Sequence, residues 1–211
     1  MKDLNKGMLI YNLKLIPKAS LFISILMVFG IQAIFSLKMA DFSMMAKIGE
    51  FIVSILGIIL IPAVAFVDEN LDIKEVIYSK AVSPVVPSVI RLVFIIMIMF
   101  LEVLTFAKIA VLQGSRFDEF SIVTRVFISA VFLGASGYMI GILSKNIALS
   151  YLVSFGYYGF EFTTKGKYTK DLYLFSLQKG YFMVEKWFLL LIAVLFFVIS
   201  LIYIGNKRAF L

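Results

Sequence analysis

Six long apolar runs divide this chain, and they limit what it can fold into more than any other feature. They fall near residues 20–37, 51–67, 89–112, 122–143, 146–162 and 187–205. A helix needs about 20 apolar residues to cross the hydrocarbon layer of a bilayer. The pattern therefore predicts an all-α integral membrane protein, with six transmembrane helices in a single domain, residues 1–211. The fifth run is short and rich in glycine and aromatic residues, so it is the weakest of the six predictions.

The composition supports a membrane protein and removes several function classes. Hydrophobic residues make up 62% of the 211 residues, charged residues 16%, and the mean hydropathy is +1.03. A water-facing surface needs far more polar side chains than this chain holds. The chain has no cysteine and no histidine, which excludes disulfides, thiol chemistry and the commonest zinc ligands. With no carboxylate cluster in the sequence either, we expect a non-catalytic protein.

The charged residues indicate which partners the protein binds more clearly than they indicate its orientation in the membrane. Sixteen lysines and four arginines give a net charge of +7. In a membrane protein this excess favours loops near lipid headgroups, so we expect membrane lipids and no nucleic acid as partners. With six spans, ten of these cations fall on each side, and their total does not set the orientation. Four lysines precede the first span against two in the next loop, which favours both termini in the cytoplasm of a multi-pass protein.

A charged segment separates the second and third runs. Asp72 and Glu75 fit a capping box, and Ile73, Val76 and Ile77 then share one face at helical spacing. Two interpretations of this short amphipathic helix stay open. Its apolar face either rests on the headgroups or enters a groove on a cytoplasmic partner.

Two prolines are expected to end this helix. Pro84 and Pro87 cannot continue it, and each disfavours helical geometry in the residue before it. The chain is therefore predicted to turn at residues 83–88, before Arg91 begins the third span.

The N-terminal residues 1–18 have the pattern of a helix lying in the membrane interface. Its apolar stripe is Leu4, Met8, Tyr11 and Leu15, and its polar side carries Lys2, Lys6 and Lys14. Pro17 is expected to break this helix before the first span. A frayed basic leader is the alternative.

A carboxylate in the middle of the third run is costly unless it faces protein or water. This residue is Glu102, with Thr105 one turn away and Arg125 or Lys108 as possible partners. Both a role in a substrate pathway or gate and a satisfied hydrogen bond between helices stay open. Glu161, at the end of the fifth run, is expected in the interface.

Small residues in the fourth and fifth runs predict close helix packing. They are Ala130, Gly134, Gly137 and Gly141 in the fourth run, and Ser150 and Ser154 in the fifth. Packing within one subunit and packing between subunits are both compatible with this spacing.

No nucleotide-binding loop is present in the sequence. The nearest match is Gly166-Lys167-Tyr168-Thr169, where Glu161 stands in place of the first glycine and Tyr168 in place of the serine or threonine. Any ATPase must therefore be a separate chain.

The order of these features resembles the ABC type-2 transporter permeases, in particular bacterial exporters of peptides, bacteriocins or drugs. The residues that carry the resemblance are Asp68, Glu69, Ser83-Pro84-Val85 and Arg91. The resemblance implies that the segment between spans two and three is a coupling helix on an ATPase subunit, which binds ATP and Mg, so that this chain holds no cofactor. The coupling residues would be Asp68, Glu69, Asp72, Ile73, Glu75, Val76, Ile77, Lys80, Ser83 and Pro84.

The resemblance also implies a second permease copy, as a homodimer or with a paralogous permease, with spans one and five at the seam. The candidate pathway and gating residues are Glu102, Thr105, Ser150, Ser154, Gly156, Tyr157, Tyr158 and Glu161. The aromatic and lysine-rich residues 156–187 form either an aromatic belt or, over Asp171 to Glu185, a short re-entrant or interfacial helical hairpin that resembles the outer gate of the family.

The function implied is the transmembrane permease subunit of an ATP-driven exporter in the bacterial cytoplasmic membrane. Its apolar, aromatic interior suits an amphipathic substrate, such as a hydrophobic, antimicrobial or toxin peptide or a lipid-like molecule. The alternative is a stand-alone immunity or binding protein that sequesters a membrane-active peptide without ATP.

Overall fold

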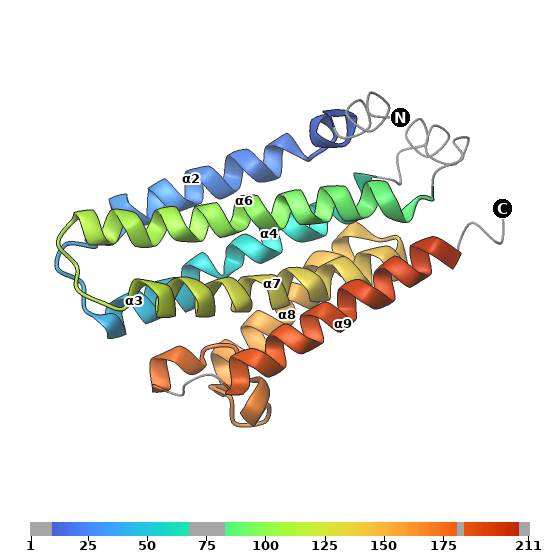
Figure 1. The fold of residues 1–211 in the computed structure, drawn as a ribbon. Helices are drawn as coiled ribbons and strands as arrows, with labels where there is room; N and C mark the ends of the chain where they lie inside the picture. The colour runs from blue at the N-terminus through green and yellow to red at the C-terminus, as the bar shows by residue number, and fades with distance from the viewer. Residues whose placement is uncertain (1–9, 68–82, 181–183, 207–211) are drawn as a thin grey trace.

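The chain folds as a bundle of antiparallel helices (Figure 1). The structure, a computed structural model, describes residues 10–67, 83–180 and 184–206, and within them it contains no strand. The main helices are α2 (Lys18–Ile34), α3 (Phe42–Ile48), α4 (Ile55–Ala65), α6 (Val85–Leu112), α7 (Glu119–Ser144), α8 (Ile147–Thr164) and α9 (Val184–Asn206). The start of α2 and the end of α9 lie at the same end of the bundle. We call this the terminal end, and the opposite one, formed by residues 35–41, 113–118 and 165–180, the ionic end.

Four helical segments are long and apolar enough to cross a membrane: Phe42–Ala65, Val85–Leu112, Glu119–Ser144 and Glu185–Asn206. These four candidates agree with the prediction of a multi-pass membrane protein. The first and fifth predicted spans are also helices, but α2 has only 17 residues and α8 does not reach the apolar character of the other four. The fifth run was the weakest of the six predictions because it is short and rich in glycine and aromatic residues.

The second span begins earlier than the sequence predicted. Asp41 caps α3 by accepting a hydrogen bond from the backbone N–H of Met44 at 2.8 Å. The helix continues through a π-helical segment, η1 (Gly49–Val53), into α4, so the predicted start at residue 51 is wrong. Lys47 and Glu50 resemble loop residues by charge, whereas the fold places them within a helix.

The predicted turn at residues 83–88 is wrong in its second part, because α6 begins at Val85. Pro84 occupies the N-cap, and Pro87 lies in the first turn of the helix, where no intrahelical partner for its missing N–H is needed. Arg91 is therefore inside the helix and fully buried. Pro17 is likewise the extended N-cap residue of α2, which confirms the predicted break.

Helix α7 is the centre of the bundle and packs most extensively on α4, α8 and α9 (Figure 1). The small residues of α7 make this possible. A Cβ added at Gly137 would approach Pro62 of α4 and the backbone of Ser150, and one at Gly141 would approach Ser150 Oγ. The small-residue pattern thus packs helices of the same chain.

The segment before α9 is irregular and lies against α3 and α9 at the ionic end. Over residues 170–180 it contains two 3-10 turns, η3 (Lys170–Leu172) and η4 (Ser176–Lys179), in place of the predicted helical hairpin. Within this segment Leu174, Phe175 and Leu177 are buried. We call residues 170–180 the cover segment.

Candidate functional site

A buried ion pair joins the cover segment to the bundle. Glu50, in the π-helical segment η1, has no exposed surface, and Lys186, in the first turn of α9, is 2% exposed. Their Oε1 and Nζ atoms lie 2.6 Å apart. The two residues are 136 positions apart in the chain, so the fold alone brings them together.

Each member of the pair has further partners. The Lys186 ammonium donates hydrogen bonds to Ser129 Oγ at 2.6 Å and to the carbonyl oxygen of Leu174. Glu50 Oε1 also accepts from the backbone N–H of Leu177 at 3.1 Å. Hydrogen bonds of this kind offset part of the cost of taking a charged pair out of water. The cluster therefore connects η1, α7, α9 and the cover segment through polar contacts.

Other ionisable groups surround this pair. Arg125 lies one turn before Ser129 on α7 and is 7% exposed, and Glu161 of α8 is fully buried. Burial and the carboxylates of Glu50 and Glu161 raise the pKa of Tyr173 to about 12, so its phenol is neutral at physiological pH. We define the ionic cluster as Glu50, Arg125, Ser129, Glu161 and Lys186.

The ionic cluster is reachable from the surface. A pocket of about 210 Å³ opens between the N-terminal turns of α7 and α9. Arg125 and Lys186 line its inner part, and the exposed aromatic rings of Phe120 and Trp187 flank it. Asp118, at the N-cap of α7, adds a carboxylate to the same pocket.

Aromatic residues of α8 hold the cover segment from a second side. Tyr157 donates a hydrogen bond to the carbonyl oxygen of Leu172 at 2.8 Å, and Tyr158 donates to that of Phe51 at 2.6 Å. Phe175 packs edge to face against both Phe51 and Tyr158. Three predicted pathway residues, Tyr157, Tyr158 and Glu161, therefore lie beside the cover segment.

The intramembrane carboxylate Glu102 lies apart from this cluster. Ser24 of α2 donates a hydrogen bond to Glu102 Oε1 at 2.7 Å. Oε2 of Glu102 is buried without a hydrogen-bond partner among the described residues. Of the partners considered from the sequence, Thr105 bonds to the carbonyl of Leu101 and Lys108 pairs with Glu119. The hydrogen bond between helices is confirmed, with a serine that the sequence did not single out.

The other predicted residues fall in different places. Ser150 and Ser154 donate hydrogen bonds to the carbonyls of Gly137 and Leu133 on α7, at 2.6 Å and 2.9 Å. Gly156 faces open space. Ser83 and Pro84 lie at the start of α6. The remaining coupling residues, Asp68, Glu69, Asp72, Ile73, Glu75, Val76, Ile77 and Lys80, are outside the described residues, as are residues 1–9 of the N-terminal helix.

Sequence reasoning missed the pair at the centre of the ionic cluster. A signal was present, because Glu50 directly precedes the second apolar run and Lys186 directly precedes the sixth. In an antiparallel bundle of six spans, both positions fall at the same end. Charges of opposite sign at one end are candidates for pairing, and buried ionisable residues in membrane helices are candidates for function.

Comparison of the chain with protein-family models, curated proteins and solved structures gives no match. In the part of the chain that the structure describes, no group of three acidic residues is placed to hold a metal ion. The fold and the cluster define an all-α protein with four membrane-span candidates and a buried ion pair near one end.

The Ser24–Glu102 hydrogen bond has a measurable contribution to stability. Ser24→Ala leaves a buried acceptor without its donor, and we expect it to lower the free energy of unfolding by about 1–2 kcal/mol. Glu102→Gln keeps an oxygen acceptor for the Ser24 hydroxyl, so it should lower the free energy of unfolding less than Ser24→Ala does. Chemical denaturation in detergent micelles provides both values. Ser200→Ala is the matched control, since among the described residues the Ser200 hydroxyl donates to the carbonyl of Phe196 in its own helix and not to another helix. Equal effects of Ser24→Ala and Ser200→Ala would contradict the prediction.

Proposed function

We propose that this chain is the membrane-spanning permease subunit of an ATP-driven ABC exporter in the bacterial cytoplasmic membrane. On this proposal six spans cross the bilayer, with α3 and α4 forming one of them through η1, and the N- and C-termini lie in the cytoplasm. The substrate is amphipathic, a hydrophobic peptide or a lipid-like molecule. A separate ATPase binds ATP and Mg, and a second permease copy, identical or paralogous, completes the pathway.

The observation that carries the proposal is that the two ends of the bundle are built differently. The terminal end brings together the start of α2, the end of α4, the start of α6 and the end of α9 (Figure 1). A partner in the cytoplasm would meet all of them on one face. At the ionic end, residues 170–180 lie against α3 and α9, and hydrogen bonds to Glu50 and Lys186 hold them in place.

This asymmetry suits alternating access. An ATPase that moves residues 68–82, which join α4 to α6 in the chain, would shift both helices. Helix α4 follows directly on η1, which contains Glu50, so the shift would reach the ion pair. Opening the ionic end would require the Glu50–Lys186 pair to separate, because Lys186 also binds Leu174 of the cover segment. On this proposal the pair is either closed or open, which would give the transporter two discrete states.

Purification tests the proposal against the stand-alone alternative. The full chain is expressed with its neighbouring open reading frames, purified in a mild detergent and assayed for ATP hydrolysis with Mg. The proposal expects an ATPase that co-purifies and whose turnover changes when this chain is omitted. A chain that is isolated alone and still protects cells or vesicles from a membrane-active peptide would favour the immunity protein.

Docking of the predicted coupling helix has its own test. Ile73→Asp places a charge on the apolar face of that helix, and we expect it to weaken ATPase association by roughly 30-fold, equivalent to about 2 kcal/mol at an interface anchor. Transport should fall while the amount of this chain in the membrane stays unchanged. Ile73→Leu is the control, because it retains the size and the apolar character. Unchanged association and transport in Ile73→Asp would contradict docking.

A further inference from the structure

A pocket of about 630 Å³ lies between the ends of α2 and α6, away from the ionic cluster. Its lining is unusual for a surface between membrane helices, because four of its seven residues are polar. The lining residues are Gln32, Ala33, Ile34, Ser36, Lys38, Leu112 and Gln113. They include one cation, two amides and one hydroxyl, and no carboxylate.

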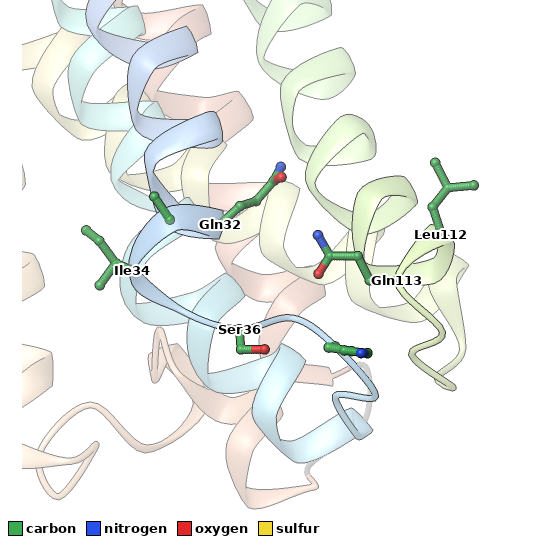
Figure 2. Close-up of a pocket in the computed structure, with 7 residues that line it drawn as sticks. Gln32, Ile34, Ser36, Leu112 and Gln113 are labelled. Atoms are coloured by element: carbon green, nitrogen blue, oxygen red, sulfur yellow. The ribbon is translucent and has the colours of Figure 1, made fainter.

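The side chains of the pocket are arranged in two sets. Figure 2 shows the amides of Gln32 and Gln113 facing one another across the opening, while Ile34 and Leu112 point away from it. Ile34 is 77% exposed and Leu112 84% exposed, so both present apolar surface beside the polar opening. Gln32 Nε2 is buried and has no hydrogen-bond partner among the described residues. A donor in that state is stabilised by a ligand that brings an acceptor oxygen.

Two connections keep the walls of the pocket in place. Deeper in the bundle, Ser24 binds Glu102 across α2 and α6. At the loops, buried Ser115 donates to the carbonyl of Leu37 at 2.5 Å and accepts from the N–H of Ala40 at 3.0 Å. Along both helices the pocket falls between these connections. It is therefore a feature of the folded chain and not a gap between loose helices.

The position of the pocket matches the depth of lipid headgroups. Helix α6 has 28 residues and is about 42 Å long at 1.5 Å per residue. A bilayer is about 40–45 Å thick with its headgroups and about 30 Å without them. The end of α6 at Leu112, beside Gln113, therefore lies among the headgroups if the helix crosses the membrane.

From these observations we infer that the pocket binds the headgroup of an anionic phospholipid. Lys38 pairs with the phosphate, the amides of Gln32 and Gln113 donate to phosphate or ester oxygens, and the acyl chains pass over Ile34 and Leu112. A free phosphate ion would use the polar groups alone and would leave the apolar flanks in water. The inference is independent of the export function, because any membrane protein with this pocket would hold the lipid.

Native mass spectrometry of the full chain in detergent tests the inference, with phosphatidylglycerol as the probe and phosphatidylcholine as the neutral-headgroup comparison. We expect one phosphatidylglycerol to bind more tightly than phosphatidylcholine. Lys38→Gln should weaken it about fivefold, the effect of one lysine near an anionic lipid. Gln32→Leu should also weaken it, while Lys47→Gln should not, because Lys47 is exposed at the same end of the bundle but does not line the pocket.

Three outcomes would overturn the inference. Equal weakening by Lys47→Gln and Lys38→Gln would indicate general attraction to the headgroups. Displacement of the lipid by millimolar inorganic phosphate would indicate a free-anion site. Finally, a phosphatidylglycerol with a photoreactive acyl chain should label peptides that contain Ile34 or Leu112, and labelling confined to other helices would place the lipid elsewhere.

Discussion

Lys186→Met is expected to lower the free energy of unfolding by about 3–5 kcal/mol, the usual cost of removing one member of a buried ion pair. The carboxylate of Glu50, which has no exposed surface, would lose the ammonium 2.6 Å away. Ser129 Oγ and the carbonyl of Leu174 would lose the same donor. Denaturant titration of the detergent-solubilised protein, followed by circular dichroism, measures the loss.

Two comparisons isolate the ion pair from the loss of a side chain. Glu50→Gln combined with Lys186→Met removes both charges of the pair and should recover most of the lost stability, because neither member is then left as a buried charge without the other. Lys108→Met is the matched control, since Lys108 pairs with Glu119 at 2.9 Å but its side chain is 58% exposed. An exposed pair contributes between about 0 and 1 kcal/mol. Similar losses for Lys186→Met and Lys108→Met would contradict the prediction.

The same variant should also loosen the cover segment. The backbone N–H of Leu177 donates to Glu50, so hydrogen exchange at Leu177 reports whether that contact persists. We expect faster exchange there in Lys186→Met than in Lys108→Met. An unchanged rate would mean that the aromatic packing of Phe175 holds the cover segment without the ionic cluster.

The sequence predicted the helical positions well because long apolar runs are a local signal. All six runs correspond to helices, and the small residues of the fourth run lie where α7 contacts its neighbours. The ends were less accurate where charge was taken to indicate a loop. Glu50 lies within the helical span because Lys186 of α9 neutralises its charge. A local sequence pattern carries no information on a partner so distant in the chain.

The candidate site was predicted only in part for the same reason. Glu102 was recognised from its cost in a membrane, but Ser24 was not, because a serine in an apolar run gives no distinct signal. The cover segment carries aromatic residues, as the sequence indicated, yet its burial and its two short turns depend on contacts with Glu50, Tyr157 and Lys186 that form only in the folded bundle. The positions of the helices along the chain could be predicted from the sequence. The contacts between side chains of different helices could not.

Gly57→Ala is expected to be as damaging as the loss of the ion pair, although it adds one methyl group. Gly57 lies in α4, and a Cβ at this position would overlap the carbonyl group of Ala130 in α7. Those atoms are backbone, so the added carbon fits only if the two helices move apart. Overpacking usually costs about 1–3 kcal/mol, and we expect a loss of at least about 3 kcal/mol here because no flexible side chain can yield.

Gly30→Ala provides the control for this substitution, since Gly30 is also inside a helix and nothing lies within 4 Å of its added Cβ. Replacing such a glycine should stabilise the helix by up to about 1 kcal/mol. The two variants therefore shift stability in opposite directions, and thermal unfolding in one detergent measures both. A Gly57→Ala protein as stable as the unsubstituted chain would show that α4 and α7 do not approach this closely. Since α7 also carries Ser129, the placement of the ionic cluster would then be wrong too.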